Sequence, residues 1–226
     1  MRTLYILLDD TLLIDMYKQF FKRFFDFCIV LFTLLIFWPI ILVITLWVKI
    51  ANKGAGAFFY QDRAGKDGKI FKLIKYKSMT DEKGTDGKLL PDTVRITKTG
   101  RFIRKTSIDE LPQLFNVLKG DMALVGPRPL LPEYTPLYNE EQRKRLNARP
   151  GITGWSQVHG RNGLKLSKRF EMDVYYTEHI SLWFDVKILW LTFYNLFATK
   201  VEVDRNALEG VDDLGFDKLA FGENHK

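Results

Sequence analysis

An uncharged run of 22 residues, Phe27–Val48, constrains the fold of this chain more than any other feature of its sequence. A straight α-helix of that length reaches about 33 Å, enough to cross the hydrocarbon core of a bilayer. Pro39 divides the run into halves of 12 and 9 residues, and each half is too short to span. The run therefore predicts a membrane segment that either spans as an ordinary helix or breaks at its proline.

The charges that flank the run favour the second alternative. Basic residues stand at both of its ends, namely Lys22, Arg23, Lys49 and Lys53. Because positive charge is retained on the cytoplasmic side of a membrane, both ends are expected on that side. We therefore expect residues 22–52 to form a re-entrant helix that enters the bilayer, breaks at Trp38-Pro39 and returns.

The charge of the chain is uneven. The formal net charge is +7, and residues 201–226 contain seven acidic and three basic residues, which leaves +11 for residues 1–200. A basic body suggests a nucleic acid, an anionic membrane or a phosphorylated substrate as its partner. A nucleic-acid binder would explain the charge but not the apolar run. The single Cys28 excludes an intramolecular disulfide and indicates a reducing compartment.

The remaining pattern predicts an α+β, mostly helical chain. Residues 1–21 read as a variable extension without the order of a signal peptide, and residues 201–226 read as an acidic tail. Residues 53–200 are expected to form one compact cytosolic catalytic domain.

Two secondary-structure predictions matter inside that domain. Strands at Phe58–Gln61 and Lys69–Lys77, around a turn at 62–68, predict a small β-hairpin. Residues 140–149 are predicted to form a charged, solvated helix. Residues 181–199 are nearly all apolar and rich in aromatic side chains, so they indicate either an amphipathic helix at the membrane interface or a buried core helix.

Candidate chemistry lies in the stretch from Arg104 to Leu118. Pro112 suits the first turn of a helix, so the helix is expected to begin between Ser107 and Asp109, with Asp109 and Glu110 at its positive end. Two carboxylates there, with Arg104 just upstream, indicate phosphoryl chemistry assisted by a divalent cation. The alternative is structural, because Ser107-x-x-Glu110 also has the form of a capping box.

Two further basic residues are candidates. Arg128 lies between Pro127 and Pro129, which restrict the backbone and present the guanidinium for phosphate or carboxylate binding. A rigid turn with a structural salt bridge is the equal alternative. Lys75, in the second predicted strand, is expected to reach a substrate phosphate, whereas His159 is expected to be structural.

These residues belong to a longer ordered series, by which the chain resembles the bacterial sugar transferases, the small monotopic phosphoglycosyl transferases. The resemblance covers residues 22–200, and Lys77 stands where that family usually has arginine. The matching blocks, in order, are Lys22-Arg23-x-x-Asp26, Gln61-x-Arg63-x-Gly65-x-x-Gly68, Lys75-Tyr-Lys-Ser-Met79, Asp92-x-x-Arg95-Ile-Thr97-x-x-Gly100-x-x-x-Arg104, Ser107-Ile-Asp-Glu-Leu-Pro-Gln113, Asn116-Val-Leu-Lys-Gly120, Val125-Gly-Pro-Arg-Pro129, Arg149-Pro-Gly-Ile-Thr-Gly154 and Gly160-Arg161.

The resemblance implies a reaction and a place for it. It implies transfer of a sugar-1-phosphate from a UDP-sugar to undecaprenyl phosphate, with release of UMP, at the cytoplasmic face of the bacterial inner membrane. It also implies Mg²⁺, a covalent phosphosugar–aspartate intermediate, a phospholipid membrane as partner and downstream glycosyltransferases. The product would begin an exopolysaccharide, capsule, O-antigen or glycoprotein glycan.

The residues fit that chemistry. Because both substrates are anions, a carboxylate nucleophile that splits the transfer into two steps is reasonable, and we assign it to Asp109. Asp109 is also the expected metal ligand, and Glu110 is expected to assist at the metal or at the incoming or leaving group. Lys75, Arg104 and Arg128 are expected to stabilise charge on the transferring group.

Two alternatives remain open from the sequence. One is a non-enzymatic module whose basic body binds anionic lipid or a partner enzyme at the membrane surface. The other is a transferase that uses a ternary complex without a covalent step. The sequence does not identify the sugar.

Overall fold

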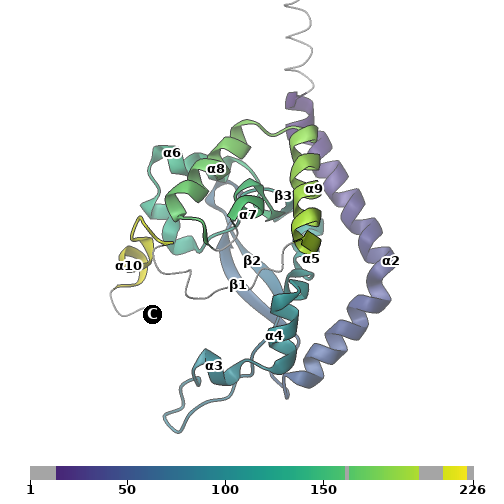
Figure 1. Ribbon diagram of the computed structural model, residues 1–226, viewed down its shortest axis with the longest axis vertical. Helices are drawn as coiled ribbons and strands as arrows, with labels where there is room; N and C mark the ends of the chain where they lie inside the picture. Colours follow the sequence, from purple (N-terminus) through teal and green to yellow (C-terminus); the bar gives the residue numbers. More distant parts are fainter. Residues whose placement is uncertain (1–13, 161–162, 199–210, 223–226) are drawn as a thin grey trace, which may run out of the picture.

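The computed structural model of the protein describes residues 14–160, 163–198 and 211–222. One long helical segment, Ile14–Ala51, begins this part of the chain, and it is long and apolar enough to cross a membrane. It contains a short π-helical stretch, η1 (Tyr17–Phe21), followed by α2 (Lys22–Ala51) with Pro39 inside it. Figure 1 shows α2 bent near its middle, with the rest of the protein on the concave side. The expected break is therefore a bend within a continuous helix, as a proline inside a helix produces.

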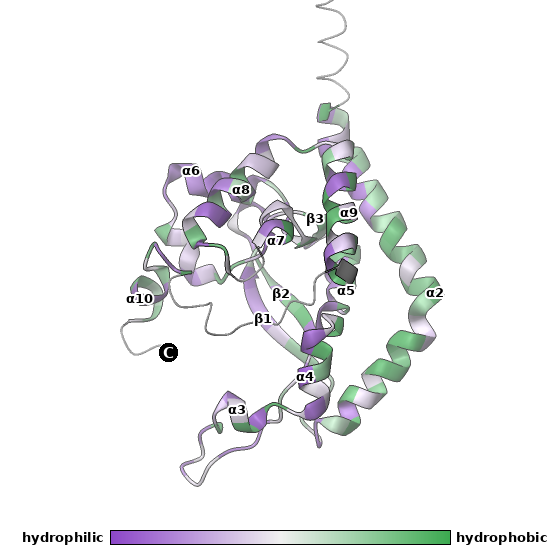
Figure 2. Ribbon diagram, viewed as in Figure 1, coloured by the Kyte–Doolittle hydropathy of each residue, from purple (hydrophilic) through white to green (hydrophobic). Residues whose placement is uncertain are grey.

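The inner face of α2 packs on the domain along its length. Val30 and Val48 are fully buried and Leu34 is nearly so, while Ile41 and Ile44 contact the same two clusters of core residues. These positions recur at spacings of three, four and seven residues, which is one face of an α-helix. The other faces expose apolar side chains, and Figure 2 shows hydrophobic colour along most of α2.

The predicted β-hairpin is present. β1 (Phe58–Ala64) pairs antiparallel with β2 (Ile70–Tyr76), and the turn between them holds the 3-10 helix η2 (Lys66–Gly68). The first strand is longer than expected, because residues 62–64 continue the pairing instead of turning. Their charged and small side chains resemble a turn in sequence, but the partner strand supplies the hydrogen bonds.

The rest of the domain is mostly helical, as expected, with a second small sheet. β3 and β4 pair in parallel, with Val125 opposite Thr153. The remaining elements, in chain order, are α3 (Asp92–Arg95), α4 (Lys98–Lys105), η3 (Ile108–Glu110), α5 (Gln113–Lys119), β3 (Ala123–Val125), η4 (Pro132–Leu137), α6 (Glu140–Arg143), η5 (Lys144–Asn147), β4 (Gly151–Thr153), α7 (Trp155–Gly160), α8 (Leu166–Glu178), α9 (Leu182–Ala198) and α10 (Phe216–Phe221).

Glycines explain how β3 and β4 approach so closely. A Cβ on Gly126 would lie 2.2 Å from the carbonyl oxygen of Arg149, and one on Gly151 would lie 2.1 Å from the amide nitrogen of Gly126. Any larger residue at either position would push the strands apart. The Gly-Pro-Arg-Pro and Pro-Gly-Ile-Thr-Gly blocks of the sequence are therefore two sides of one contact.

The charged helix predicted for residues 140–149 is wrong in extent and in exposure. α6 ends at Arg143, and a 3-10 turn, η5, follows it. Arg145 is only 2% exposed and pairs with Asp173 of α8, whose carboxylate lies 2.7 Å away. A charge pattern along one segment cannot reveal a buried partner that is 28 residues further along the chain.

The aromatic segment forms α9, which has one buried face, as a core helix would, and one exposed aromatic face. Ile188 is fully buried, whereas Trp183 and Trp190 are 80% and 67% exposed. Of the predicted acidic tail, residues 211–222 are described, and their Phe216 is buried against Tyr138 and Phe170. That part of the tail therefore packs on the catalytic domain.

A buried amide joins α5 to the hairpin. Asn116 is fully buried; its Oδ1 accepts a hydrogen bond from the Ile74 amide at 3.0 Å, and its Nδ2 donates to the Lys72 carbonyl at 2.8 Å. Ile74 directly precedes Lys75 in β2, and Lys72 lies three residues before it. The amide therefore fixes the position of that lysine relative to α5.

Replacement of this amide should weaken the fold. Asn116→Ala would leave the Ile74 amide and the Lys72 carbonyl without their partner, so we expect a loss of about 2 kcal/mol or more in the free energy of unfolding. Chemical unfolding in detergent micelles would measure it. As a control, Lys72→Ala breaks only an exposed ion pair with Asp62 and should change stability by less than about 0.5 kcal/mol. Equal effects of the two variants would contradict this role of Asn116.

Candidate active site

A tight turn places the two carboxylates. Ser107 follows α4 with φ of 57°, a left-handed conformation that is unfavourable for any residue with a Cβ, and its side chain caps nothing. The capping-box alternative is therefore wrong. Asp109 and Glu110 lie in the 3-10 turn η3, and α5 begins only at Gln113, with Pro112 as its N-cap. The helix that the sequence placed at residues 107–109 thus starts later than expected.

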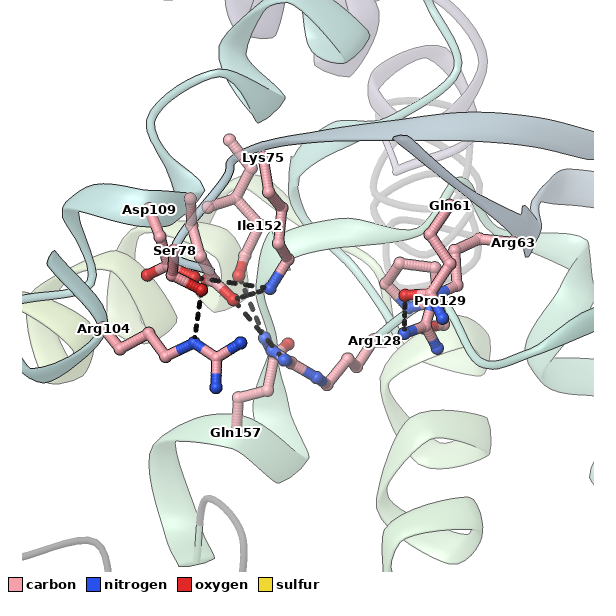
Figure 3. Close-up of polar contacts among 11 residues, drawn as sticks. Gln61, Arg63, Lys75, Ser78, Arg104, Asp109, Arg128, Pro129, Ile152 and Gln157 are labelled. Atoms are coloured by element: carbon pink, nitrogen blue, oxygen red, sulfur yellow. Dashed lines mark hydrogen bonds and ion pairs between the residues drawn. The ribbon is translucent and has the colours of Figure 1, made fainter. Parts of the chain in front are cut away.

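Glu110 is the centre of an ion-pair cluster. Lys75 Nζ, which β2 presents, lies 2.7 Å from Glu110 Oε1 and 4.0 Å from Asp109 Oδ2. Arg128 Nη2 lies 3.4 Å from the same Glu110 oxygen. Figure 3 shows Lys75 and Arg128 reaching the carboxylates from different segments of the chain. Of the two alternatives for Arg128, the salt bridge is formed, and its partner is the candidate site itself.

Arg104 reaches the same place from α4. Its Nε donates to Ser78 Oγ at 2.8 Å, and Ser78 is buried. In Figure 3 the guanidinium groups of Arg104 and Arg128 point toward one another beside the carboxylates. All five residues predicted from the sequence are therefore gathered, although they come from β2, α4, η3 and the loop after β3.

The two carboxyl groups have opposite electrostatic surroundings. Burial, which disfavours a charge, raises the pKa of Asp109; Lys75 and Arg104 oppose this rise and Glu110 adds to it. Burial also acts to raise the pKa of Glu110, but Arg128 and Lys75 together hold it below its ordinary value. Adjacent acids whose pKa values are pushed apart are typical of acid, base and nucleophile assignments.

The donor atoms fit the magnesium ion that the resemblance implies. Asp109 and Glu110 offer adjacent carboxylates whose side chains are 13% and 22% exposed. Within the described residues no group of three or more His, Cys, Asp or Glu could hold a metal. Mg²⁺ commonly takes one or two protein carboxylates and fills its remaining positions with phosphate and water. The site thus suits a cation that shares its ligands with a bound diphosphate.

Some residues of this region were missed by the sequence reasoning. Ser78 supports Arg104, and Arg63 donates through Nη2 to Gln61 at 2.7 Å and through Nη1 to the Pro129 carbonyl at 3.4 Å. Gln157 donates to the Ile152 carbonyl beside Arg128, as Figure 3 shows. Ser78, Gln61 and Arg63 lie in the sequence blocks by which the chain resembles its family. Those blocks marked the three positions, but they did not indicate what each side chain does.

His159 takes no part in this cluster. Its ring Nδ1 lies 2.9 Å from the carbonyl oxygen of Trp155, one turn earlier on α7. This contact is the kind of hydrogen bond expected of a structural histidine, and the structural interpretation stays a prediction. Arg161, the last residue of the family-like blocks, lies outside the described residues.

Comparison with known proteins agrees with the geometry. Residues 17–199 match the profile of a family described as bacterial sugar transferase. The chain is 54% identical over 171 residues to the uncharacterized sugar transferase EpsL of Bacillus subtilis, with 76% of this chain and 84% of that protein aligned.

Longer relatives carry more specific names. The chain is 42% identical over 193 residues to the undecaprenyl-phosphate galactose phosphotransferase of Salmonella typhimurium, covering 77% of this chain and 40% of that protein. It is 38% identical over 199 residues to the UDP-glucose:undecaprenyl-phosphate glucose-1-phosphate transferase of Escherichia coli, covering 81% and 41%. The chain therefore spans about two fifths of the length of these two relatives.

The opposite pKa shifts predict opposite effects of neutralising each acid. A carboxyl whose pKa is raised by folding destabilises the folded state above its unfolded pKa, so Asp109→Asn should raise the thermal midpoint at pH 7. A carboxyl whose pKa is lowered stabilises the folded state there, so Glu110→Gln should cost about 2 kcal/mol, or roughly 4–8 °C.

Thermal unfolding in detergent at several pH values would measure both effects. The difference between wild type and Glu110→Gln should narrow as the pH falls below the ordinary range of carboxylic acids, because Glu110 is then protonated in both states. A destabilised Asp109→Asn, or a stabilised Glu110→Gln, at pH 7 would contradict these electrostatics.

Proposed function

The chain belongs to the bacterial sugar transferase family, and on that basis we propose that it transfers a sugar-1-phosphate from a UDP-sugar to undecaprenyl phosphate, releasing UMP. One observation carries the proposal: Asp109 and Glu110 stand beside Lys75, Arg104 and Arg128 in one cluster. Carboxylates offer a nucleophile and cation ligands, while the three basic groups can compensate phosphate charge. The names of the relatives, which act on UDP-glucose or on undecaprenyl phosphate, agree with these substrate classes.

The reaction would proceed in two displacements. In the first, an Asp109 oxygen attacks the sugar-bearing phosphorus of the UDP-sugar, forms a P–O bond to it and expels UMP. In the second, a phosphate oxygen of undecaprenyl phosphate attacks the same phosphorus, and the Asp109 carboxylate leaves. The product is an undecaprenyl diphosphosugar, and the carboxylate is regenerated with no net change in protons or electrons.

The environment of Asp109 suits this role. A carboxylate whose pKa is raised by burial is more basic, and therefore more nucleophilic, than one in water. Two anions repel each other, so attack on a diphosphate requires positive charge nearby. Lys75, Arg104 and Arg128 provide it, and a magnesium ion held by Asp109, with or without Glu110, would neutralise further phosphate charge.

Glu110 has a different task. Its lowered pKa keeps it ionised, and its contacts with Lys75 and Arg128 hold both cations beside Asp109 before substrate arrives. When phosphate oxygens enter, these cations can exchange part of their contact with Glu110 for contact with substrate. Such preorganisation avoids the cost of orienting charges during the reaction.

The attachment of α2 supports the re-entrant arrangement. At the first residue of α2, Lys22 Nζ lies 2.6 Å from Asp185 Oδ2. Just after the end of the helix, the Asn52 side chain donates to the Lys77 carbonyl at 2.7 Å. Both ends of the helix are therefore fixed to one domain, whereas a spanning helix would separate them by about 30 Å of hydrocarbon. We infer that α2 dips into the cytoplasmic leaflet, that the exposed aromatic face of α9 meets the interface, and that the cluster lies at headgroup height.

This placement also suits the two substrates. A UDP-sugar arrives from the cytosol, and undecaprenyl phosphate presents its phosphate at the membrane surface. The product remains in the membrane, where glycosyltransferases could extend it toward a surface polysaccharide or glycan.

Loss of the nucleophile should stop the reaction. Asp109→Asn should reduce UMP release from UDP-glucose or UDP-galactose with undecaprenyl phosphate by at least ~10³-fold, because the first bond cannot form. Incubation of wild type with the UDP-sugar alone should give a sugar-phosphate mass adduct on Asp109. Asp62→Asn, at an exposed carboxylate of the hairpin, is the matched control and should retain activity.

The outcomes separate the alternatives. Activity without an adduct would favour a ternary-complex mechanism. Membrane binding without any UMP release from a panel of UDP-sugars would favour a non-enzymatic surface module.

The topology of α2 can be tested by chemical labelling. Gln19→Cys and Lys53→Cys, each in a Cys28→Ser background, place a thiol at either end of the helix, where both positions are exposed. A membrane-impermeant maleimide should label both positions in inside-out vesicles and neither in right-side-out vesicles. Labelling from opposite sides would show a spanning helix and contradict the proposal.

A further inference from the structure

A buried ion pair lies behind the loop that carries Arg128, apart from the groups assigned to substrate. Arg145 of η5 and Asp173 of α8 are 2% and 1% exposed. The Nη2 and Nε atoms of Arg145 lie 2.7 and 3.2 Å from Asp173 Oδ2. The proposed reaction uses neither residue, so the presence of this pair needs another reason.

The guanidinium of Arg145 also holds the backbone of Arg128. Its Nη2 donates to the Arg128 carbonyl oxygen at 2.7 Å. Because Pro127 and Pro129 have no N–H groups, this loop has few donors with which to fix its own conformation. The carbonyl therefore depends on a donor from another element.

The helix that carries Asp173 holds the other end of the same loop. The hydroxyl of Tyr176, one turn further along α8, lies 3.1 Å from the Val125 carbonyl oxygen and 2.7 Å from Asp185 Oδ1, so these two acceptors share its one proton. The segment from Val125 to Arg128 is thus attached to α8 at both ends, directly through Tyr176 and through Arg145 on Asp173. Between these two attachments to α8, β4 also holds the segment, because the Gly126 amide donates to the Thr153 carbonyl at 2.9 Å and the Gly151 amide donates to the Pro127 carbonyl at 3.0 Å.

The ion pair is itself restrained to one geometry. Ser156 Oγ donates to Asp173 Oδ1 at 2.7 Å, and Arg145 Nη1 donates to the Tyr138 hydroxyl at 3.3 Å. The Phe170 ring centroid lies 5.2 Å from the centre of the guanidinium. Buried ion pairs often add little stability compared with apolar residues of similar size, so a fixed geometry is a better explanation of this one than stability.

We propose that Arg145, fixed by Asp173, is a positioning residue that sets the distance between the Arg128 guanidinium and Glu110, and hence the place of Arg128 against the transferring phosphate. This inference rests on the proposed function for its kinetic consequence. A displacement of about 1 Å at a catalytic group can reduce a rate by about 100-fold. Lysine cannot replace Arg145, because one ammonium group cannot make the fork of contacts with Asp173 and the Arg128 carbonyl.

A double-mutant cycle would test the dependence on Arg128. The variants are Arg145→Lys, Arg128→Ala and the double variant of the full chain in nanodiscs, assayed for UMP release with UDP-glucose or UDP-galactose, whichever wild type uses. Arg145→Lys should reduce kcat/KM by about 10- to 100-fold when Arg128 is present and by less than about twofold when it is absent. Independent, multiplying losses would overturn the proposal.

A matched control separates position from stability. Val174→Ala removes a buried apolar side chain from the same helix, next to Asp173, without touching the polar contacts. Its loss of activity should be the same with and without Arg128. Ser156→Ala, which removes one contact of Asp173, should give a kcat/KM between those of wild type and Arg145→Lys. If the loss caused by Arg145→Lys were also the same with and without Arg128, as expected for Val174→Ala, the result would count against the proposal.

Hydrogen exchange gives a readout that needs no activity. In Arg145→Lys the amides of Gly126, Arg128, Leu130 and Leu131 should exchange faster than in wild type, relative to the rest of the chain, and in Val174→Ala they should not. Unchanged exchange in this segment would overturn the positioning role even if the enzyme is active. Absence of turnover by wild type with every UDP-sugar would reject the proposed function, while the exchange result would still decide the positioning of the loop.

Discussion

The 2.7 Å ion pair between Lys75 and Glu110 is the interaction on which the rest of the site depends. It joins β2 to η3, and Arg128 reaches the same carboxylate oxygen from the loop after β3. Glu110 therefore binds two cationic side chains that are distant in the sequence: Lys75 is 35 residues away and Arg128 is 18 residues away. Because the side chains of Lys75 and Glu110 are each only about one fifth exposed, their attraction is weakly screened by solvent. Asp109, one residue earlier, lies 4.0 Å from Lys75 Nζ, and the positive charges of Lys75 and Arg104 both act to lower its pKa.

Each part of this cluster is supported by a buried polar side chain from another element. Asn116 of α5 holds the strand that carries Lys75, Ser78 holds Arg104, and Arg145 holds the backbone of Arg128. None of these supports touches the carboxylates. Precise placement of a few charges thus requires several hydrogen bonds behind them, and these can form only in the complete fold.

The membrane segment is integrated with that support. α2 packs one apolar face on the hairpin and on α5, and its first turn ends in a buried cluster where Lys22 and the Tyr17 hydroxyl bind Asp185. The same Asp185 accepts a hydrogen bond from Tyr176, whose hydroxyl also binds the Val125 carbonyl. A continuous set of contacts therefore leads from the membrane helix to the loop of Arg128. In the proposed function, this continuity would hold the site at a fixed depth relative to the lipid phosphate.

Local sequence was enough to predict the apolar helix with its proline and the hairpin, because neighbouring residues with strong conformational preferences specify both. It was also enough to name the candidate site residues from their chemistry and their immediate neighbours, namely Asp109, Glu110, Lys75, Arg104 and Arg128. Tertiary structure alone decided that Ser107 turns instead of capping a helix, that Arg145 is buried in an ion pair, and that part of the acidic tail packs on the core. It also decided which carboxyl has a raised pKa and which a lowered one. The physical reason is the same in each case: burial and pairing depend on partners far away in the chain, and no short stretch of sequence contains them.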